Sequence, residues 1–326
     1  MRLERVPLED VDWEAMDALG DRNVFQTRPW MEFVERTQQA DPVVARLERG
    51  DEPAGWFTGF VIRRFGVPIL GSPFQGWTTG PMGFNLLPGT SLREAVEALV
   101  PFAFRRLRCL HLEMLDRRAS VDDLQGVPGR LADFHTYELD LAPDEEEIFG
   151  GMSSACRRAV RKSEKEGVRV EEAHGVEFAD EYYAQLEDVF AKQSLTPPYG
   201  VDRVRELIRC VDPTGNLLLL RALSPGGESI ATGIFPVMNQ FGYFWGGASW
   251  RRHQILRPNE AVFWYAMRRM KERGIPLLDM GGGGDYKRKY GGRQRFIPIF
   301  RRSRMKGLMT IRDLAAKIYW RRATAR

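Results

Sequence analysis

The sequence predicts an α/β (α+β) fold made of two similar domains, each a mixed, mostly antiparallel sheet flanked by helices. Three observations support this prediction. The chain has 326 residues, 43% hydrophobic and 28% charged, which is the composition of a folded globular protein and a length suited to two domains. Short apolar strand patterns, separated by turns rich in Gly, Pro and Asn, occupy both halves. The same order of strands, helix and strand occurs twice.

The first half supplies three strand patterns before its main helix. We expect strands at 43–48, 55–65 and 67–71, a helix at 91–106 and a further strand at 109–115. Hairpins between the first three strands followed by a returning helix and strand describe a mixed sheet with a helix on its face.

The second half repeats that plan. We expect strands at 217–223, 229–238 and 243–249, a helix at 260–273 and a buried strand at 275–280. The turns between its first three strands carry the Gly and Asn that tight hairpins require. The repeat indicates a duplicated domain, with a single large sheet as the structural alternative.

The helix in the second half has clear end signals. Asn259 is expected to cap its start, and Gly274 to end it. An acidic segment around 142–150 is the expected linker. The predicted domains are therefore 1–145 and 146–300, followed by a basic C-terminal helix or tail at 301–326.

The net charge of +4 conceals an uneven distribution. Residues 287–326 hold 14 of the 48 Lys and Arg but one of the 44 acidic residues, so the rest of the chain has 34 basic and 43 acidic residues. Such a basic segment suggests a polyanionic partner: RNA, nucleotide phosphates or an anionic membrane face. A solvated basic helix would give the same pattern.

The sequence also indicates the cellular compartment of the protein and the kinds of catalysis to expect. The N-terminus lacks the apolar core of a signal peptide, no stretch reaches about 18 apolar residues, and the three Cys are far apart in sequence. We therefore expect a cytoplasmic protein with free thiols. The four His show no metal-ligand spacing and no nucleophile elbow is present, so neither a metal site nor covalent catalysis is expected.

A basic helix is predicted at 153–167. Its cations recur at i, i+3, i+4 and i+7, which places four of them on one face: Arg158, Arg161, Lys162 and Lys165. Such a row can bind phosphates. A solvated face partly neutralised by Glu164 and Glu166 is the alternative.

A glycine-rich segment directly follows the strand at 275–280. Four consecutive glycines, 281–284, can bring backbone amides close to a ligand, and Lys287 can neutralise a phosphate or a developing oxyanion. Asp279 is a candidate general base at the strand end. The segment fits neither a P-loop nor a dinucleotide fingerprint, and a structural turn is the alternative.

Five segments resemble the Fem family of aminoacyltransferases, which add amino acids from aminoacyl-tRNA to peptidoglycan precursors, and the wider GNAT-like N-acyltransferases. The similarity spans most of the chain. The segments are Phe25–Trp30, Gly80–Met82, Arg157–Val170, Pro258–Glu260 and Tyr286–Gly291. The last is similar to the family's Phe-Lys-x-x-Phe-Gly. Thr79 stands where the family has an arginine, and no coiled-coil insertion interrupts the second domain.

The resemblance implies two tandem GNAT-like domains and a role in acyl transfer for Lys287, with Asp279 beside it as the second expected catalytic residue. Donor or phosphate binding is expected from the basic helix together with Lys289 and Asn259. The acceptor pocket is expected to use aromatic side chains, namely Trp30, Tyr243, Trp245 and Tyr286. Core and rim packing is the alternative for these aromatics.

The leading expectation is transfer of an aminoacyl group from aminoacyl-tRNA to a primary amine, on a peptidoglycan precursor or another peptide or amine, with no bound cofactor and no DNA partner. One alternative keeps the fold and uses an acyl-CoA donor, whose pyrophosphate would lie at the start of the 260–273 helix. A second alternative is a non-enzymatic adaptor that contacts RNA or a membrane through the basic tail.

Overall fold

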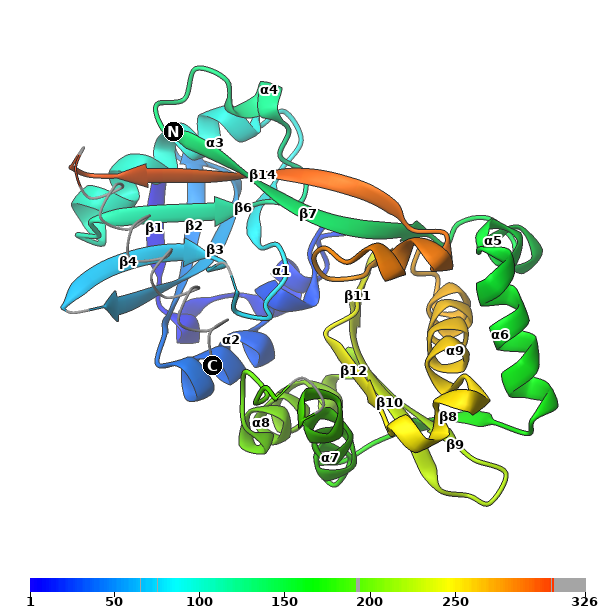
Figure 1. Ribbon diagram of the computed structural model, residues 1–326. Helices are drawn as coiled ribbons and strands as arrows, with labels where there is room; N and C mark the ends of the chain where they lie inside the picture. The colour runs from blue at the N-terminus through cyan, green and yellow to red at the C-terminus, as the bar shows by residue number, and fades with distance from the viewer. Residues whose placement is uncertain (65, 75, 192–193, 306, 308–326) are drawn as a thin grey trace. The chain divides into compact units, whose positions relative to one another are not determined.

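The computed structural model describes residues 1–64, 66–74, 76–191, 194–305 and 307 (Figure 1). It divides into two compact units. Unit 1 comprises Met1–Phe134 and the chain from Phe296 onward, and unit 2 comprises His135–Arg295. Of the C-terminal helix or tail predicted at 301–326, residues 301–303 instead form the end of a strand. The part beyond Gly307, and the membrane contact expected of it, lie outside the described residues.

Unit 1 contains a mixed sheet in which the β4–β6 pair is parallel and the other pairs whose register is resolved are antiparallel. Its strand order is β1 (Arg2–Val6), β2 (Asp41–Arg49), β3 (Glu52–Arg64), β4 (Val67–Ser72), β6 (His111–Leu115) and β14 (Arg293–Ser303), and β5 (Gly83–Leu86) pairs with β3. Its helices are α1 (Trp13–Asp17), α2 (Arg28–Gln38), α3 (Leu92–Pro101) and α4 (Val121–Leu124).

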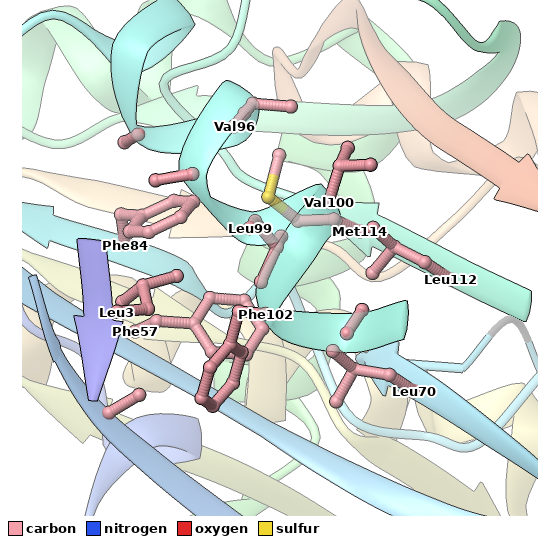
Figure 2. Packing of buried hydrophobic residues seen from close by; sticks show 14 of the residues in the cluster. Leu3, Phe57, Leu70, Phe84, Val96, Leu99, Val100, Phe102, Leu112 and Met114 are labelled. Atoms are coloured by element: carbon pink, nitrogen blue, oxygen red, sulfur yellow. The ribbon is translucent and has the colours of Figure 1, made fainter. Parts of the chain in front are cut away.

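Helix α3 covers the hydrophobic core of unit 1. Ser91 and Glu94 form a capping box that fixes its first turn. The apolar face of α3, with Val96 and Leu99, packs on strand residues such as Phe57 (Figure 2). The π-helical turn η3 (Phe102–Arg106) follows directly, so the helix predicted at 91–106 is an α-helix only as far as Pro101.

Unit 2 repeats this plan. Its strand order is β7 (Arg130–Asp140), β13 (Leu277–Asp279), β11 (Phe241–Tyr243), β10 (Ser229–Met238), β9 (Leu217–Leu223) and β8 (Arg169–Ala173), and β12 (Gly246–Ser249) pairs with β10. Its helices are α5 (Glu145–Gly151), α6 (Ser154–Lys165), α7 (Phe178–Ala191), α8 (Val201–Val211) and α9 (Pro258–Glu272). The β11–β13 pair is parallel, as the β4–β6 pair is in unit 1.

The two units thus share an antiparallel series of strands, a short strand beside the third of them, a helix, and a strand that returns in parallel. This confirms the predicted fold class. The units divide at 134/135 and 295/296, whereas the boundaries predicted from sequence are 145/146 and 300/301. Strands β7 and β14 each cross from one unit into the other. The boundaries between the units therefore lie within strands, whereas the first boundary predicted from sequence lies in the acidic segment around 142–150.

Two local predictions are wrong. The strand expected at 243–249 is broken at Phe244 and Trp245, because the backbone changes its pairing partner there. The residue that caps α9 is Arg257 in the left-handed conformation (φ 59°), and not Asn259, whose amide donates a hydrogen bond to the Ser249 hydroxyl at 3.1 Å. Within the described residues, no helix is both long and apolar enough to cross a membrane.

Candidate functional site

The site centres on the glycine loop, residues 280–284, which joins β13 to the 3-10 segment η6 (Asp285–Tyr290). Gly281, Gly282 and Gly284 have φ values of 69°, 76° and 133°, which side chains with a Cβ rarely adopt. A Cβ at Gly281 would also lie 2.7 Å from the carbonyl oxygen of Phe244. The glycines are therefore required by the course of the backbone.

Lys287 holds this loop from inside. Its side chain is buried, 3% exposed, and Nζ donates hydrogen bonds to the carbonyls of Met280 (2.7 Å), Gly281 (2.5 Å) and Gly282 (3.0 Å). Burial lowers the pKa of Lys287 from 10.5 to about 8, and the nearby Asp279 carboxylate opposes that shift. An ammonium group has three donors, and all three are used by the loop.

Asp279 organises the same loop from the strand end. It is fully buried, and its Oδ1 accepts hydrogen bonds from the Gly281 amide (2.8 Å) and the Thr136 hydroxyl. The Thr136 oxygen accepts in turn from the Gly282 amide at 3.2 Å. The carboxylate therefore fixes loop amides in this structure, and its expected role as a general base remains a prediction.

Strand β7 supplies two residues that sequence reasoning missed. Besides Thr136, Tyr137 donates from its hydroxyl to Asp285 at 3.1 Å. No local pattern points to either residue, because both act on partners more than 140 positions away in sequence.

The β-sheet splits open beside the glycine loop. The Phe244 amide donates to the Asp279 carbonyl (2.8 Å), whereas the next amide, of Trp245, donates to the Ile234 carbonyl on β10 (3.0 Å). The backbone thus leaves β13 at this point and continues as β12 on β10 alone. This divergence lies directly against the loop, since Gly281 contacts Phe244.

Aromatic side chains line the diverging strand. Trp245 lies 5.1 Å from Tyr199 and 6.4 Å from Tyr182 between ring centroids, and the two tyrosine hydroxyls are 2.8 Å apart. Burial raises the pKa of both tyrosines, so they remain neutral. A Cβ at Gly246 would lie 2.4 Å from the Tyr182 hydroxyl oxygen. The sequence analysis identified Trp245 but neither tyrosine.

The four predicted acceptor-pocket residues have different environments. Tyr286 is 56% exposed, with its ring 5.8 Å from Lys287 Nζ, so its face is open to a ligand. Tyr243 and Trp245 are buried beside the loop. Trp30 is fully buried in unit 1, and its indole N–H donates to Thr79 at 3.3 Å. Thr79 is the residue that stands where the family has an arginine.

The four cations of α6 form a surface row. Arg158, Arg161 and Lys165 are exposed and Lys162 is half-buried, while the opposite face of α6 packs toward α9. Arg161 lies over the Phe149 ring at 5.3 Å. Among the described residues, none of the four forms an ion pair with an acid, so their charge is available to a phosphate-bearing ligand.

The start of α9 is occupied by the protein's own groups. Pro258 is the first helical residue and lacks an N–H. The mostly buried carboxylate of Glu260 in the first turn pairs with Lys289 Nζ at 2.6 Å. Lys289 and Asn259, both predicted to bind donor phosphates, are thus held by internal partners. In the described part of the chain, no group of three or more His, Cys, Asp or Glu is arranged to hold a metal ion.

The class of this protein is defined by a mixed sheet with one long helix packed on it, in which two parallel strands diverge beside a glycine loop. Residues 152–290 match the family model described as an acetyltransferase (GNAT) domain. The chain is a GNAT-fold transferase, with that domain in unit 2.

Solved structures specify the fold further. FemX superposes with a TM-score of 0.77 at 12% identity, over 94% of this chain and 99% of that chain. A tandem GNAT protein from the clavulanic acid biosynthesis pathway gives 0.54 at 12% identity, over 93% and 98%. L-PGS from Bacillus licheniformis gives 0.54 at 13% identity, over 87% and 95%. No curated protein matches the sequence. The fold is therefore FemX-like, as the resemblance implied.

Proposed function

We propose that this N-acyltransferase transfers an aminoacyl group from aminoacyl-tRNA to a primary amine, on a peptidoglycan precursor or another peptide or amine, in the cytoplasm and without a bound cofactor. The similarity to FemX, which extends over nearly the whole of both chains, supports the choice of the aminoacyl transfer that is typical of the Fem family. The observation that carries the choice of donor is the occupied start of α9.

An acyl-CoA donor would place its pyrophosphate on the amides at a helix start, where the helix dipole favours an anion. At α9 one of those amides is missing at Pro258, and the carboxylate of Glu260 already lies in the first turn. A pyrophosphate there would have to compete with the Glu260 carboxylate for Lys289, its ion-pair partner. The exposed cations of α6 offer phosphates a better place.

The proposed reaction needs little beyond positioning and charge. The neutral amine attacks the ester carbonyl, a C–N bond forms, the C–O bond to the ribose breaks, and the amine proton passes to the leaving ribose oxygen. Positioning and oxyanion stabilisation lower such a barrier by several kcal/mol. In this proposal the positive charge of Lys287 stabilises the oxyanion, either through the loop or by exchanging one carbonyl partner for the substrate oxygen.

The neighbouring groups have matching roles in this proposal. Asp279 keeps the loop amides in position, and the α6 cations bind phosphates of the RNA or of the acceptor. Tyr286 offers an open ring beside the reacting groups. Tyr243 and Trp245 form the wall behind them.

An acyl-CoA donor is the second candidate. It is favoured by the match of residues 152–290 to an acetyltransferase domain and by the similarity to the tandem GNAT protein, which was solved without AcCoA.

A competition titration tests the proposal. A labelled aminoacyl-tRNA is displaced by uncharged tRNA or by acetyl-CoA at several salt concentrations, since salt separates specific from merely polyanionic binding. We expect charged tRNA to bind more tightly than uncharged tRNA and acetyl-CoA not to compete. Competition by acetyl-CoA, with tRNA binding lost as salt rises, would overturn the donor assignment in favour of the second candidate.

A further inference from the structure

Unit 1 carries a concentrated group of arginines far in sequence from the glycine loop. We call it the arginine edge. It consists of residues from the end of β3, the segment from η3 to β6, and the end of β14: Arg63, Arg64, Arg105, Arg106, Arg108, Arg302 and Arg304. Six of them are exposed and Arg302 is half-buried.

Strand pairing brings these three segments to one end of the sheet. Arg63 lies opposite Pro68, the Pro68 carbonyl accepts from the Leu110 amide (2.9 Å), and the Leu110 carbonyl accepts from the Arg304 amide (2.9 Å). At a spacing of about 4.8 Å between neighbouring strands, the edge from β3 to β14 spans roughly 14 Å.

Two further contacts join the members of the edge. Arg105 and Arg302 line one hollow together. The charge of Arg63 also reaches the thiol of Cys109, since it opposes the rise in the pKa of that group to about 11 that burial causes. The arginines therefore gather at one end of the sheet.

This surface has little negative charge to balance it. The segments 63–72, 105–110 and 302–305 contain no acidic residue. Glu97 and Glu4 line hollows beside Arg105, and within the described residues neither forms an ion pair with the edge. Arginine clustering without acids raises the self-repulsion of the folded chain, so a polyanionic partner would stabilise it.

We propose that the arginine edge binds the phosphate backbone of an RNA helix. Every cation of the edge is arginine, whose planar fork matches phosphate oxygens and which is the usual choice for nucleic-acid contacts. A membrane-binding surface would instead combine its cations with several exposed large apolar side chains. Among the described residues of the three segments, Met305 is the exposed large hydrophobic one, at 62%.

The inference deepens the proposed function, because an aminoacyl-tRNA donor carries an RNA helix next to its reactive end. It also makes a separate claim about where that helix is held. Recognition through phosphates is independent of sequence, so the edge would bind the acceptor stem of any tRNA and would leave the choice of amino acid to the site in unit 2.

The test uses an uncharged RNA minihelix with the full-length protein. One triple variant removes three edge cations: Arg63→Gln, Arg106→Gln and Arg304→Gln. The matched control removes three arginines that are paired with acids, of which Arg28 and Arg209 are exposed and Arg205 is half-buried: Arg28→Gln, Arg205→Gln and Arg209→Gln. Both lower the net charge equally. Circular dichroism and thermal unfolding establish that both variants fold.

We expect the edge variant to bind the minihelix roughly tenfold or more weakly at 0.1 M salt, and its slope of log affinity against log salt to be shallower by about 2–3. The control should keep the wild-type slope. Equal slopes for the edge variant and the wild type would overturn the inference. So would wild-type binding to phosphatidylglycerol vesicles that is lost in the edge variant while minihelix binding persists.

The same variants separate this inference from the proposed function. If charged tRNA remains a donor with unchanged KM in the edge variant, the arginine edge is not its binding surface and the proposed function stands. If acetyl-CoA proves to be the donor while the minihelix still binds through the edge, the proposed function fails and the RNA surface remains.

Discussion

Replacing Lys287 by Met removes the ammonium group that holds the glycine loop and keeps a side chain of similar length. Three N–H···O bonds to the carbonyls of residues 280–282 are lost, and with them the positive charge beside the diverging strands. Lys271 provides a matched control, because its Nζ also donates to three carbonyls, those of Leu141, Ala142 and Pro143. Lys271→Met removes an equivalent set of bonds without touching the loop.

The structure sets the expected magnitudes. The fall in the pKa of Lys287 from 10.5 to about 8 means that burial disfavours the charged form by roughly 3 kcal/mol at neutral pH. Because that pKa is a net value, the three hydrogen bonds to the loop carbonyls offset only part of the cost of burying the ammonium group. We therefore expect Lys287→Met to destabilise the fold by only ~1–2 kcal/mol. If the charge stabilises an oxyanion, kcat should fall by about 10²–10³ with KM for the donor nearly unchanged.

The pH dependence gives a second readout. Between pH 8 and 10.5 the unfolded chain keeps the Lys287 proton that the folded chain has lost, so the wild type gains stability as pH rises through this window. Chemical denaturation at pH 8.0 and 9.5 should show a gain of up to about 2 kcal/mol relative to Lys287→Met. The turnover of the wild type should fall above pH 8 as the ammonium loses its charge.

Steady-state kinetics of Lys287→Met and Lys271→Met test whether Lys287 has a catalytic role. Equal losses in kcat and in donor affinity would refute the catalytic role of Lys287 and leave a binding role. A loss of turnover in Lys271→Met as large as that in Lys287→Met would show that the effect follows from general destabilisation.

Two further substitutions test the surroundings of the loop. Asp279→Asn weakens a buried acceptor of the Gly281 amide and the Thr136 hydroxyl. We therefore expect the free energy of unfolding to fall by about 1–3 kcal/mol and the amides of Gly281 and Gly282 to exchange hydrogen faster. Unchanged exchange would contradict the role given to the carboxylate. Gly246→Ala places a Cβ against the Tyr182 hydroxyl and should lower the free energy of unfolding by about 1–3 kcal/mol. The loss should be smaller in a Tyr182→Phe background. If the losses of the two single variants add exactly in the double variant, this contact is ruled out.

The sequence predicts most of the buried strands because their apolar patterns are local. Strands β9 and β10 have the bounds expected from the runs at 217–223 and 229–238. Strand β7 is missed because much of it is exposed and polar, so its side chains lack a clear alternation of apolar and polar residues. The break after Tyr243 is missed because the glycines and aromatics on either side of it also suit a continuous strand.

The site is predictable only in part for a similar reason. The glycine run and Lys287 are adjacent in sequence, so the loop and its lysine can be recognised together. The role of Thr136 depends on a partner 143 residues away, and that of Tyr182 on the close approach of Gly246. Packing decides both contacts. Packing also decides that Trp30, an aromatic residue in a family-like motif, is a core residue with no exposed surface.

The duplication explains why the chemistry is proposed for unit 2. In unit 1, strand β6 is followed by a buried carboxylate, Asp116, and in unit 2 strand β13 ends on a buried carboxylate, Asp279. Asp116 accepts from the Phe84 amide at 2.8 Å and the Arg118 amide at 2.9 Å. No glycine run follows it, and the Arg118 guanidinium instead donates to the Phe84 carbonyl and to Asp21.

A buried carboxylate at the end of the returning strand is thus common to both units, whereas the groups beside it differ. In unit 1 an arginine side chain binds the backbone at the place where unit 2 has its glycine loop and Lys287. The carboxylate is therefore part of the shared architecture, and the loop with its lysine is what distinguishes unit 2. Because the arginine edge also lies in unit 1, the two proposals assign RNA binding to unit 1 and acyl transfer to unit 2.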